Sequence, residues 1–380
     1  MNIRLCFALL LLASFASCTT DAPRPLQEAQ ARKDPAFTEF FRRKTGWTAG
    51  DGALSIPLSD DRVLWLFGDS HVDDFDARTR TIPCLFQARN AGLLQGAPEV
   101  RGQKPEISKQ PQSDRTLVRK GPGSRSWLAR ADAIDEWFWP LSGFQNGEVV
   151  YIYLSALTRS GVGGMWDFRS TGHDYWAKVK FPEMEPIEYS TLPSFHGITF
   201  GNGFVTEDDY TYAFGGRQKG DASDVYVARF RSANPESEWS FWDEEHWNSN
   251  VTNASAIARG ASTSIHVCKV RNKFLLTTSA LSVACDQGKE IYMSTSSHPI
   301  GPFSPRKKVF TIDDCYRGHY PFFYFPIAHP EFINSQDELL VTYSINGYEP
   351  CVSSCVKGRA IPDHYRPKAI RVPLELIGIK

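Results

Sequence analysis

Short apolar segments with the composition of β-strands recur along most of this chain, and they constrain its fold more than any other feature. They are rich in Val, Ile, Tyr and Phe and are bounded by Gly, Asn, Asp and Pro, as strands that end in tight turns require. Examples are VVYIYLSAL, VYVARF, KFLLTTSAL, ELLVTYSI and AIRVPLELI. Only PAFTEFFRRKTGW, before the first strand, indicates a helical turn or two. The sequence therefore predicts an all-β fold.

The strands group into hairpin units that begin near Gly50, Trp139, Phe195, Ser262 and Ile327. Units of this kind suit a five-bladed β-propeller, in which each blade buries its faces against its neighbours and the inner strands meet at a central cleft. A pair of β-sandwiches is the alternative, and it would have two separate cores without a common cleft.

The first residues have the features of an export signal. The apolar run LCFALLLLASF is followed by small residues and Cys18, so we interpret residues 1–18 as a signal peptide. The residues before Cys18 resemble a bacterial lipobox, which predicts lipidation of Cys18; a plain cleaved signal is the alternative. Residues 19–40 are then a tether and N-terminal segment, and residues 41–380 form the propeller. We expect an outer-membrane or cell-surface lipoprotein, or otherwise a periplasmic or secreted protein.

Composition narrows the range of partners. A net charge of −1 argues against nucleic-acid binding and against attraction to an anionic membrane, so we expect membrane contact only through the lipid anchor. Phosphate-loop, serine-esterase and zinc-protease motifs are absent from the sequence. Aromatic residues make up 13% of the chain, which suits a protein that binds glycans, although most of them belong in a core. We expect a monomer whose partner is a glycan substrate.

One segment, at about residues 92–132, departs from the strand pattern. It is polar, basic and contains prolines. We interpret it as an insertion between blades, which is either solvated or forms a wall of the cleft.

The cysteines outside the signal indicate disulfides rather than a metal site. Their number is even, as expected for an exported protein, and Cys351 with Cys355 or Cys285 with Cys315 are candidate pairs. No second close Cys or His pair completes a zinc site. The sequence therefore predicts no metal ligands and no required cofactor, while an ion such as calcium on the propeller axis stays open.

The stretch GDGALSIPLSDDRVLWLFGDS reads as a hairpin with an aspartate at each open end. Apolar residues alternate on one face of each strand, namely Leu54, Ile56 and Leu58 on the first and Leu64 and Leu66 on the second. If these faces pack together, the numbers of paired residues have an even sum, and Asp51 and Asp69 lie on one face. Directly opposed residues have Cβ atoms roughly 4.5 to 5.5 Å apart. A turn of different length would separate the two aspartates.

Two carboxyl groups at that spacing do not both ionise freely, so one becomes a proton donor beside an anion. Glycoside hydrolysis uses such a pair as acid and as base or nucleophile. The simpler interpretation is that Asp51 and Asp69 cap backbone amides at a turn. A surface glycan-binding lipoprotein without catalysis is the alternative function.

Further polar and aromatic residues stand near the predicted starts of blades. Arg89 and Asn90 are expected to bind sugar hydroxyls or to bridge two blades. His196 and His329 are expected to contact a sugar, an ion or water, or to be satisfied core residues. Trp139 is expected to form a stacking platform for a sugar ring.

The segment GWTAGDGALSIPLSDDRVLWLFGDSHV resembles the first blade of secreted five-bladed propellers grouped as domain of unknown function families 4185 and 5005. RNAGLL, WFWPLSG, YAFGG, SHPIGPF, IAHPEF, VTYSIN and HYRPKAIRVPL follow in the order found in such propellers, so the resemblance spans nearly the whole mature chain. The first of these families includes glycoside hydrolase family 183, which resembles endo-acting D-arabinanases with paired aspartates in the first blade. The resemblance implies that Asp51 and Asp69 are that pair and that the substrate is a glycan, with an arabinan-like furanoside as the candidate. The basic segment and HGITFGNGFVTEDD do not align with this pattern, so the substrate does not transfer with the motif.

Overall fold

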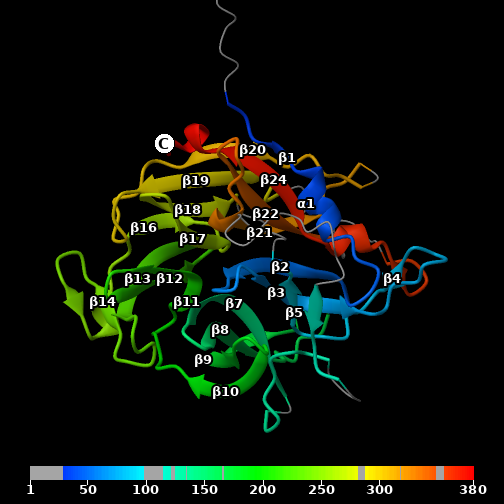
Figure 1. Cartoon of the computed structure of the whole chain (residues 1–380), viewed down its shortest axis with the longest axis horizontal. Helices are drawn as coiled ribbons and strands as arrows, with labels where there is room; N and C mark the ends of the chain where they lie inside the picture. Colours follow the sequence, from blue (N-terminus) through cyan, green and yellow to red (C-terminus); the bar gives the residue numbers. More distant parts are fainter. Residues whose placement is uncertain are drawn as a thin grey trace, which may run out of the picture.

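The structure, a computed structural model, describes residues 29–97, 114–120, 125–133, 135–164, 167–280, 287–316, 318–347 and 355–380. In this part of the chain, five sheets of four or six antiparallel strands are formed, and a small two-stranded sheet lies outside them. The sheets follow one another around a centre in chain order, from the blue β2 through the green and yellow blades to the orange β22 (Figure 1). The prediction of an all-β, five-bladed propeller is confirmed. No helix among the described residues is long and apolar enough to cross a bilayer.

In each blade the strands follow one another from the centre of the ring outwards. Blade 1 contains β2 (Trp47–Pro57), β3 (Val63–Val72), β5 (Ala91–Gln95) and β6 (Arg115–Leu117). Blade 2 contains β7 (Glu136–Asn146), β8 (Val149–Thr158), β9 (Arg169–Lys180) and β10 (Glu185–Thr191). Blade 3 contains β11 (Thr199–Glu207), β12 (Tyr210–Lys219), β13 (Ala222–Arg231), β14 (Ser240–Trp242) and β15 (Trp247–Asn248), with β16 (Ala258–Ala261) also paired to β13. Blade 4 contains β17 (Ile265–Val270), β18 (Lys273–Ser279), β19 (Glu290–Ser296) and β20 (Lys307–Thr311). Blade 5 contains β21 (Phe322–His329), β22 (Glu338–Asn346), β24 (Lys368–Pro373) and the N-terminal β1 (Arg32–Lys33).

Each pair of neighbouring blades encloses an apolar layer. Between blades 1 and 2, Ile56 packs in one buried cluster with Phe138 and Ile152. Burial of a large apolar side chain stabilises a fold by about 1.5–3 kcal/mol. The other layers include Trp176 with Phe230, Phe214 with Phe274, Cys268 with Val341, and Trp65 with Leu340. No blade is self-sufficient, because its core residues are buried against the next blade.

The opening hairpin has the register that its apolar pattern predicts. Leu54 pairs with Leu66 and Ile56 pairs with Leu64. All four side chains belong to the layer that faces blade 2. The period of two in the sequence therefore identified both the pairing and the buried face of this hairpin correctly.

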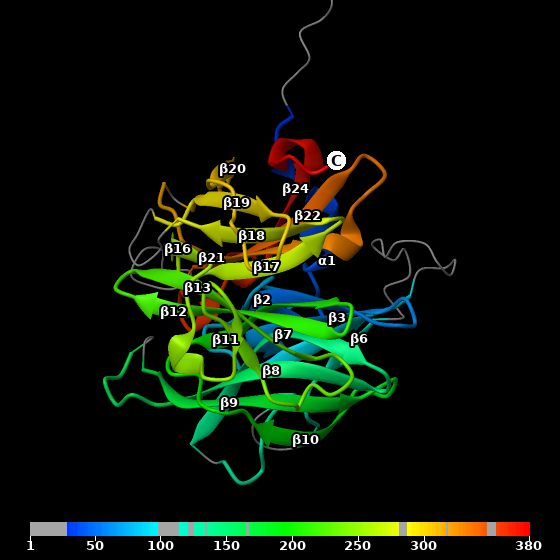
Figure 2. The ribbon, with the colours of Figure 1, turned by 90° about the vertical axis from the view of Figure 1, so that its left-hand side faces the viewer.

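The ring is closed by the N-terminal strand. β1 is the outermost strand of blade 5, where Arg32 pairs with Arg371 and Lys33 with Ile370 of β24. The blue β1 and the red β24 lie side by side in Figure 1, and Figure 2 shows the same segments near one end of the molecule. The propeller therefore begins before residue 41, where we had expected its boundary.

Asp34 joins this closure to the short helix α1 (Pro35–Phe40). Its buried carboxylate accepts a hydrogen bond from Nε of Arg371 at 2.7 Å and another from the backbone N–H of Phe37 at 3.0 Å. The first contact pairs a buried charge, and the second caps the helix N-terminus.

The segment 92–132 is not a simple insertion. Its beginning lies in β5, its middle supplies β6, and Trp127 and Leu128 are buried in the layer between blades 1 and 2. The interpretation of these parts as an insertion between blades was wrong. The two strands are short, and the polar residues between them hid the strand pattern in the sequence. Residues 98–113 and 121–124 lie outside the described residues.

A disulfide links two loops on either side of the closure. Cys84 is bonded to Cys355, and beside this bond β4 (Ile82–Pro83) pairs with β23 (Arg359–Ala360). The two cysteines are separated by 271 residues in the sequence. Closure of the ring brings blades 1 and 5 together and thereby makes this bond possible.

The expected pair Cys351–Cys355 is therefore wrong. Spacing along the sequence suggested a local loop, whereas the partner of Cys355 comes from another blade. Cys315 has no disulfide partner among the described residues, and Cys285 and Cys351 lie outside them.

Replacing Asp34 with Ala should destabilise the protein strongly. The change leaves the buried Arg371 without its carboxylate and uncaps α1, so we expect the free energy of unfolding to fall by about 3–5 kcal/mol, measured by denaturant titration. Arg32→Gln is the matched control, because it breaks a pair with Glu338 in which the Arg32 side chain is 53% exposed. That variant should lose less than about 1 kcal/mol. Equal losses in the two variants would contradict a special role of Asp34.

Candidate active site

The two predicted aspartates lie where the inner strands of blades 5, 1 and 2 meet. Asp51 is on β2 and Asp69 is on the neighbouring β3. Tyr324 of β21 contacts Asp51, and Trp139 of β7 contacts Asp69. Side chains from three consecutive blades therefore converge on the pair.

The ladder between β2 and β3 is irregular beside Asp51. The pairing shifts between Gly50 and Gly52 and again between Gly52 and Leu54, and Gly52 and Ala53 have φ values of 96° and 65°. Such bulges redirect side chains near active sites. We had expected Asp51 and Asp69 to form a regular cross-strand pair, and the bulge shows that they do not. Their residue numbers still sum to 120, as do those of the regular pairs on either side.

Gly68 provides the space for this arrangement. A Cβ atom at Gly68 would lie 2.5 Å from Oδ1 of Asp51 and 3.9 Å from Cδ1 of Trp139. The Asp51 carboxylate therefore occupies the position where any other residue would place its side chain. The Gly-Asp pair 68–69 places one carboxyl group and makes room for the other.

Asp51 is half-buried and lies beside two hydroxyl donors. Oη of Tyr324 donates to its Oδ2 at 2.8 Å, and Tyr365 supplies a second side-chain hydrogen bond. Burial raises the pKa of Asp51 to about 6, while the two tyrosine hydrogen bonds act in the opposite direction. Asp51 therefore titrates close to neutral pH and has donors that stabilise its anion.

Asp69 is buried beside Asp51 and contacts a cation. Burial, followed by the negative charge of Asp51, raises the pKa of Asp69 to about 7, and Arg89 and Trp139 lower it in part. Nη1 of Arg89 lies 3.4 Å from Oδ1 of Asp69, and Nε1 of Trp139 lies 3.4 Å from the same atom. The Arg89 guanidinium also lies 4.3 Å from the ring centroid of Trp137. The structure thus brings Arg89 and Trp139 to the pair, while their role in substrate binding stays a prediction.

Asn90 does not face the site. Its Nδ2 donates to the carbonyl oxygens of Leu128 and Phe138 at 2.8 and 2.9 Å, and its Oδ1 accepts the N–H of Leu128 at 2.8 Å. The residue is fully buried. Its assignment to substrate binding is wrong, because the amide bridges blade 1 to blade 2.

His329 is also a structural residue. It is fully buried, with Nδ1 2.6 Å from Oγ of Ser55 and Nε2 2.9 Å from Oγ1 of Thr342. Burial lowers the pKa of His329 well below its usual value, so the imidazole is neutral. Ser55 also donates to Glu331, whose pKa burial raises to about 7. The expected sugar contact of His329 is therefore wrong, and Glu331 is a half-buried acid in the same hydrogen-bond network.

His196 differs from His329 because it is exposed. It lies in the loop three residues before β11, the inner strand of blade 3, with φ of 50°. Its role in substrate binding stays a prediction. Cys18, the expected lipidation site, lies outside the described residues.

Two tyrosines of the site were not found by sequence reasoning. Tyr324 lies in the aromatic run PFFYFP, and Tyr365 lies in HYRPKAIRVPL, which was used only as evidence of family resemblance. Neither tyrosine has a sequence pattern around it that indicates a functional site. Among the described residues, no group of three or more His, Cys, Asp and Glu side chains could hold a metal ion. The site consists of two carboxyl groups with tyrosine, tryptophan and arginine neighbours.

Several solved structures are similar to this chain in fold. A Bacteroides ovatus protein provisionally assigned as a hydrolase is 18% identical, with 92% of this chain and 93% of that chain covered and a TM-score of 0.69. A GH43_1 enzyme from Xanthomonas citri is 12% identical over 91% and 90% of the two chains, with a TM-score of 0.46. The catalytic domain of a Coprinopsis cinerea GH62 alpha-L-arabinofuranosidase is 9% identical over 90% and 94%, with a TM-score of 0.45. At 18% identity, the similarity to the first structure shows a shared fold and nothing about activity. The other two similarities are too weak to support a conclusion.

No curated protein matches the chain. The family model described as Domain of unknown function (DUF5005) matches residues 34–374, which run from the buried aspartate at the ring closure to the end of the last blade. This is the second of the two families that the sequence resembles, whereas the arabinanase-like expectation came from the first. With its propeller fold and nearly its whole described length matched, the chain belongs to the DUF5005 family.

Proposed function

We propose that this protein hydrolyses a glycosidic bond in a polysaccharide or oligosaccharide. The observation that carries the proposal is the pair Asp51 and Asp69, which lie on neighbouring strands. Asp51 is half-buried and Asp69 is buried, and burial raises the pKa of both towards neutrality. Glycosidases need one carboxyl group that holds a proton and one that is ionised at the same pH. The pair can supply both states near pH 6 to 7.

The neighbours of the two aspartates suggest their roles. Asp51 accepts hydrogen bonds from Tyr324 and Tyr365, which stabilise the carboxylate, so we assign it as the base or nucleophile. Asp69 keeps its proton to higher pH because it is buried and because Asp51 is negatively charged beside it, so we assign it as the acid for the leaving oxygen. Loss of the Asp51 proton thus favours retention of the proton on Asp69.

Arg89 and Trp139 are the candidate substrate contacts. Arg89 combines a guanidinium near Asp69 with a stacked Trp137 ring, and its side chain is 33% exposed. A guanidinium with free N–H groups and an indole are both suited to sugar hydroxyls and ring faces. The choice of an arabinan-like furanoside rests on the resemblance of the first blade, and export through a lipid anchor at Cys18 rests on the signal-like N-terminus.

Replacement of either aspartate by Asn should abolish most of the activity. The amide can neither donate the proton nor act as base or nucleophile, so we expect kcat to fall about 10²–10⁴-fold in Asp51→Asn and Asp69→Asn. Release of reducing ends from arabinan, galactan and other plant or bacterial glycans is the measurement. Asp61→Asn at the turn of the same hairpin is the control, and it should keep full activity.

Two results would contradict the proposal. Full activity in both Asp51→Asn and Asp69→Asn would remove the pair from the chemistry. Glycan binding by the wild-type protein without any release of reducing ends would instead support a non-catalytic glycan-binding protein.

Activity should depend on pH as a bell-shaped curve. It should fall below about pH 6, where Asp51 becomes protonated, and above about pH 7, where Asp69 loses its proton. Because Arg89 lowers the pKa of Asp69, Arg89→Gln should move the alkaline limb to higher pH by roughly 1 unit. Because Tyr324 lowers the pKa of Asp51, Tyr324→Phe should move the acid limb to higher pH. Limbs that stay in place in both variants would show that other groups titrate.

A further inference from the structure

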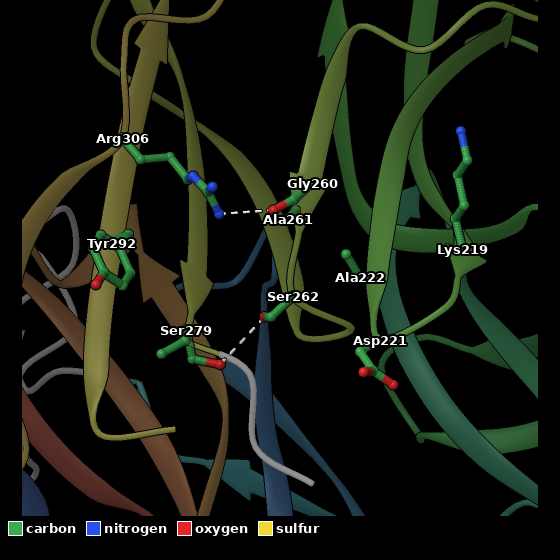
Figure 3. A pocket seen from close by; sticks show the side chains of 10 residues that line it. Lys219, Asp221, Ala222, Gly260, Ala261, Ser262, Ser279, Tyr292 and Arg306 are labelled. Atoms are coloured by element: carbon green, nitrogen blue, oxygen red, sulfur yellow. Dashed lines mark hydrogen bonds between the residues drawn. The ribbon is translucent and has the colours of Figure 1, made fainter. Parts of the chain in front are cut away.

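A cavity lies between blades 3 and 4, and neither Asp51 nor Asp69 belongs to its lining. It has a volume of about 580 Å³, within the range of small-molecule sites. Figure 3 shows Lys219 and Asp221 of blade 3 on one wall and Arg306 and Tyr292 of blade 4 on the other. Residues from two blades thus face one space that neither blade forms alone.

The floor of the cavity is a network of hydroxyl groups. Ser262 and Ser279 are buried, and their Oγ atoms lie 3.3 Å apart (Figure 3). Ser262 also contacts Oγ1 of Thr278 at 2.8 Å. The floor is therefore polar and held in place by its own hydrogen bonds, as a preformed site requires.

The walls of the cavity carry charged and aromatic side chains that can bind a ligand. Nη1 of Arg306 donates to the carbonyl oxygen of Gly260 at 2.8 Å, which orients the guanidinium across the cavity (Figure 3). Lys219 and Asp221 are exposed and form no ion pair within the described part of the chain. Tyr292 is half-buried, and within the same part of the chain no aromatic contact to its ring occurs.

The cavity lies towards the same end of the inner strands as the active site. The N–H of Phe325 donates to Oγ of Ser264 just before β17, and the adjacent Tyr324 donates to Asp51. Ser262 is two residues before Ser264. The floor of the cavity and the aspartate pair are therefore both near the ends at which the inner strands begin.

We propose that this cavity is a second glycan-binding site that takes a carboxylate-bearing sugar, such as a uronate. Arg306 and Lys219 supply positive charge for the carboxylate, because guanidinium and ammonium groups form the strongest hydrogen bonds to carboxylates. Tyr292 offers a ring face to the sugar, and Asp221 and the serines can bind hydroxyl groups. The inference adds a site to the proposed function and rests on it for the choice of a glycan as ligand.

The test is a binding titration with trigalacturonate, and with neutral galactotriose for comparison. Calorimetry is performed on Asp69→Asn, in which hydrolysis is suppressed, and on the same protein with Lys219→Gln and Arg306→Gln added. We expect the two added changes to weaken trigalacturonate binding at least about tenfold. Lys307→Gln with Lys308→Gln is the matched control, because it removes the same charge from exposed positions of blade 4 and should leave binding unchanged.

Several outcomes would overturn the inference. These are no binding of trigalacturonate, equal affinity for galactotriose, or equal weakening by the Lys307 and Lys308 changes. If the Arg306→Gln variant does not fold, Lys219→Gln alone still tests the site, because Lys219 is exposed. Unchanged affinity for trigalacturonate in Lys219→Gln counts against the inference.

Hydrolysis and binding are separate readouts. Specific trigalacturonate binding by a protein that cleaves no glycan would support the second site while rejecting the proposed catalysis. Cleavage of a glycan without specific trigalacturonate binding would reject the second site alone.

Discussion

The structure depends on the closure of the ring between its first and last blades. Every apolar layer lies between two blades, so the blades are stable only when each has a neighbour on both sides. β1 completes the ring by pairing with β24 of blade 5. Beside this pairing, the Asp34 carboxylate accepts a hydrogen bond from Arg371. The candidate site depends on the same closure, because Asp51 of blade 1 receives its hydrogen bond from Tyr324 of blade 5.

At the site, the regular geometry of the blades is disturbed in both contributing strands. Ala53 next to the β2 bulge and Phe325 next to Tyr324 have φ values of 65° and 48°. Non-glycine residues in this region cost roughly 1–3 kcal/mol each and occur where the surrounding structure holds them. Here the ladder of β21 also shifts between Tyr324 and Ile327. The strain occurs where Tyr324 and Asp51 meet in a hydrogen bond. Removal of the Asp51 and Asp69 carboxyl groups from water adds a further cost.

The sequence was most informative where contacts are local. Leu54 and Leu66 revealed the register of the opening hairpin because strand alternation has a period of two and the turn between the strands is short. The same register placed Asp51 and Asp69 on neighbouring strands at one end, so the pair could be found before the structure. It did not reveal the bulge at Gly52, because a glycine is compatible with both a regular strand and a bulge.

The errors came from contacts between blades. Asn90 and His329 looked like available polar side chains, but both are buried and satisfied by residues of adjacent segments. Tyr324 and Cys355 find their partners 273 and 271 residues away in the sequence. By itself, the sequence determined the all-β class, the five repeated units and the position of the aspartate pair, because all three follow from short-range periodicity. Only the tertiary structure decided which polar side chains are buried and which groups tune the two carboxyl groups, because these depend on how blades far apart in the sequence meet around the ring.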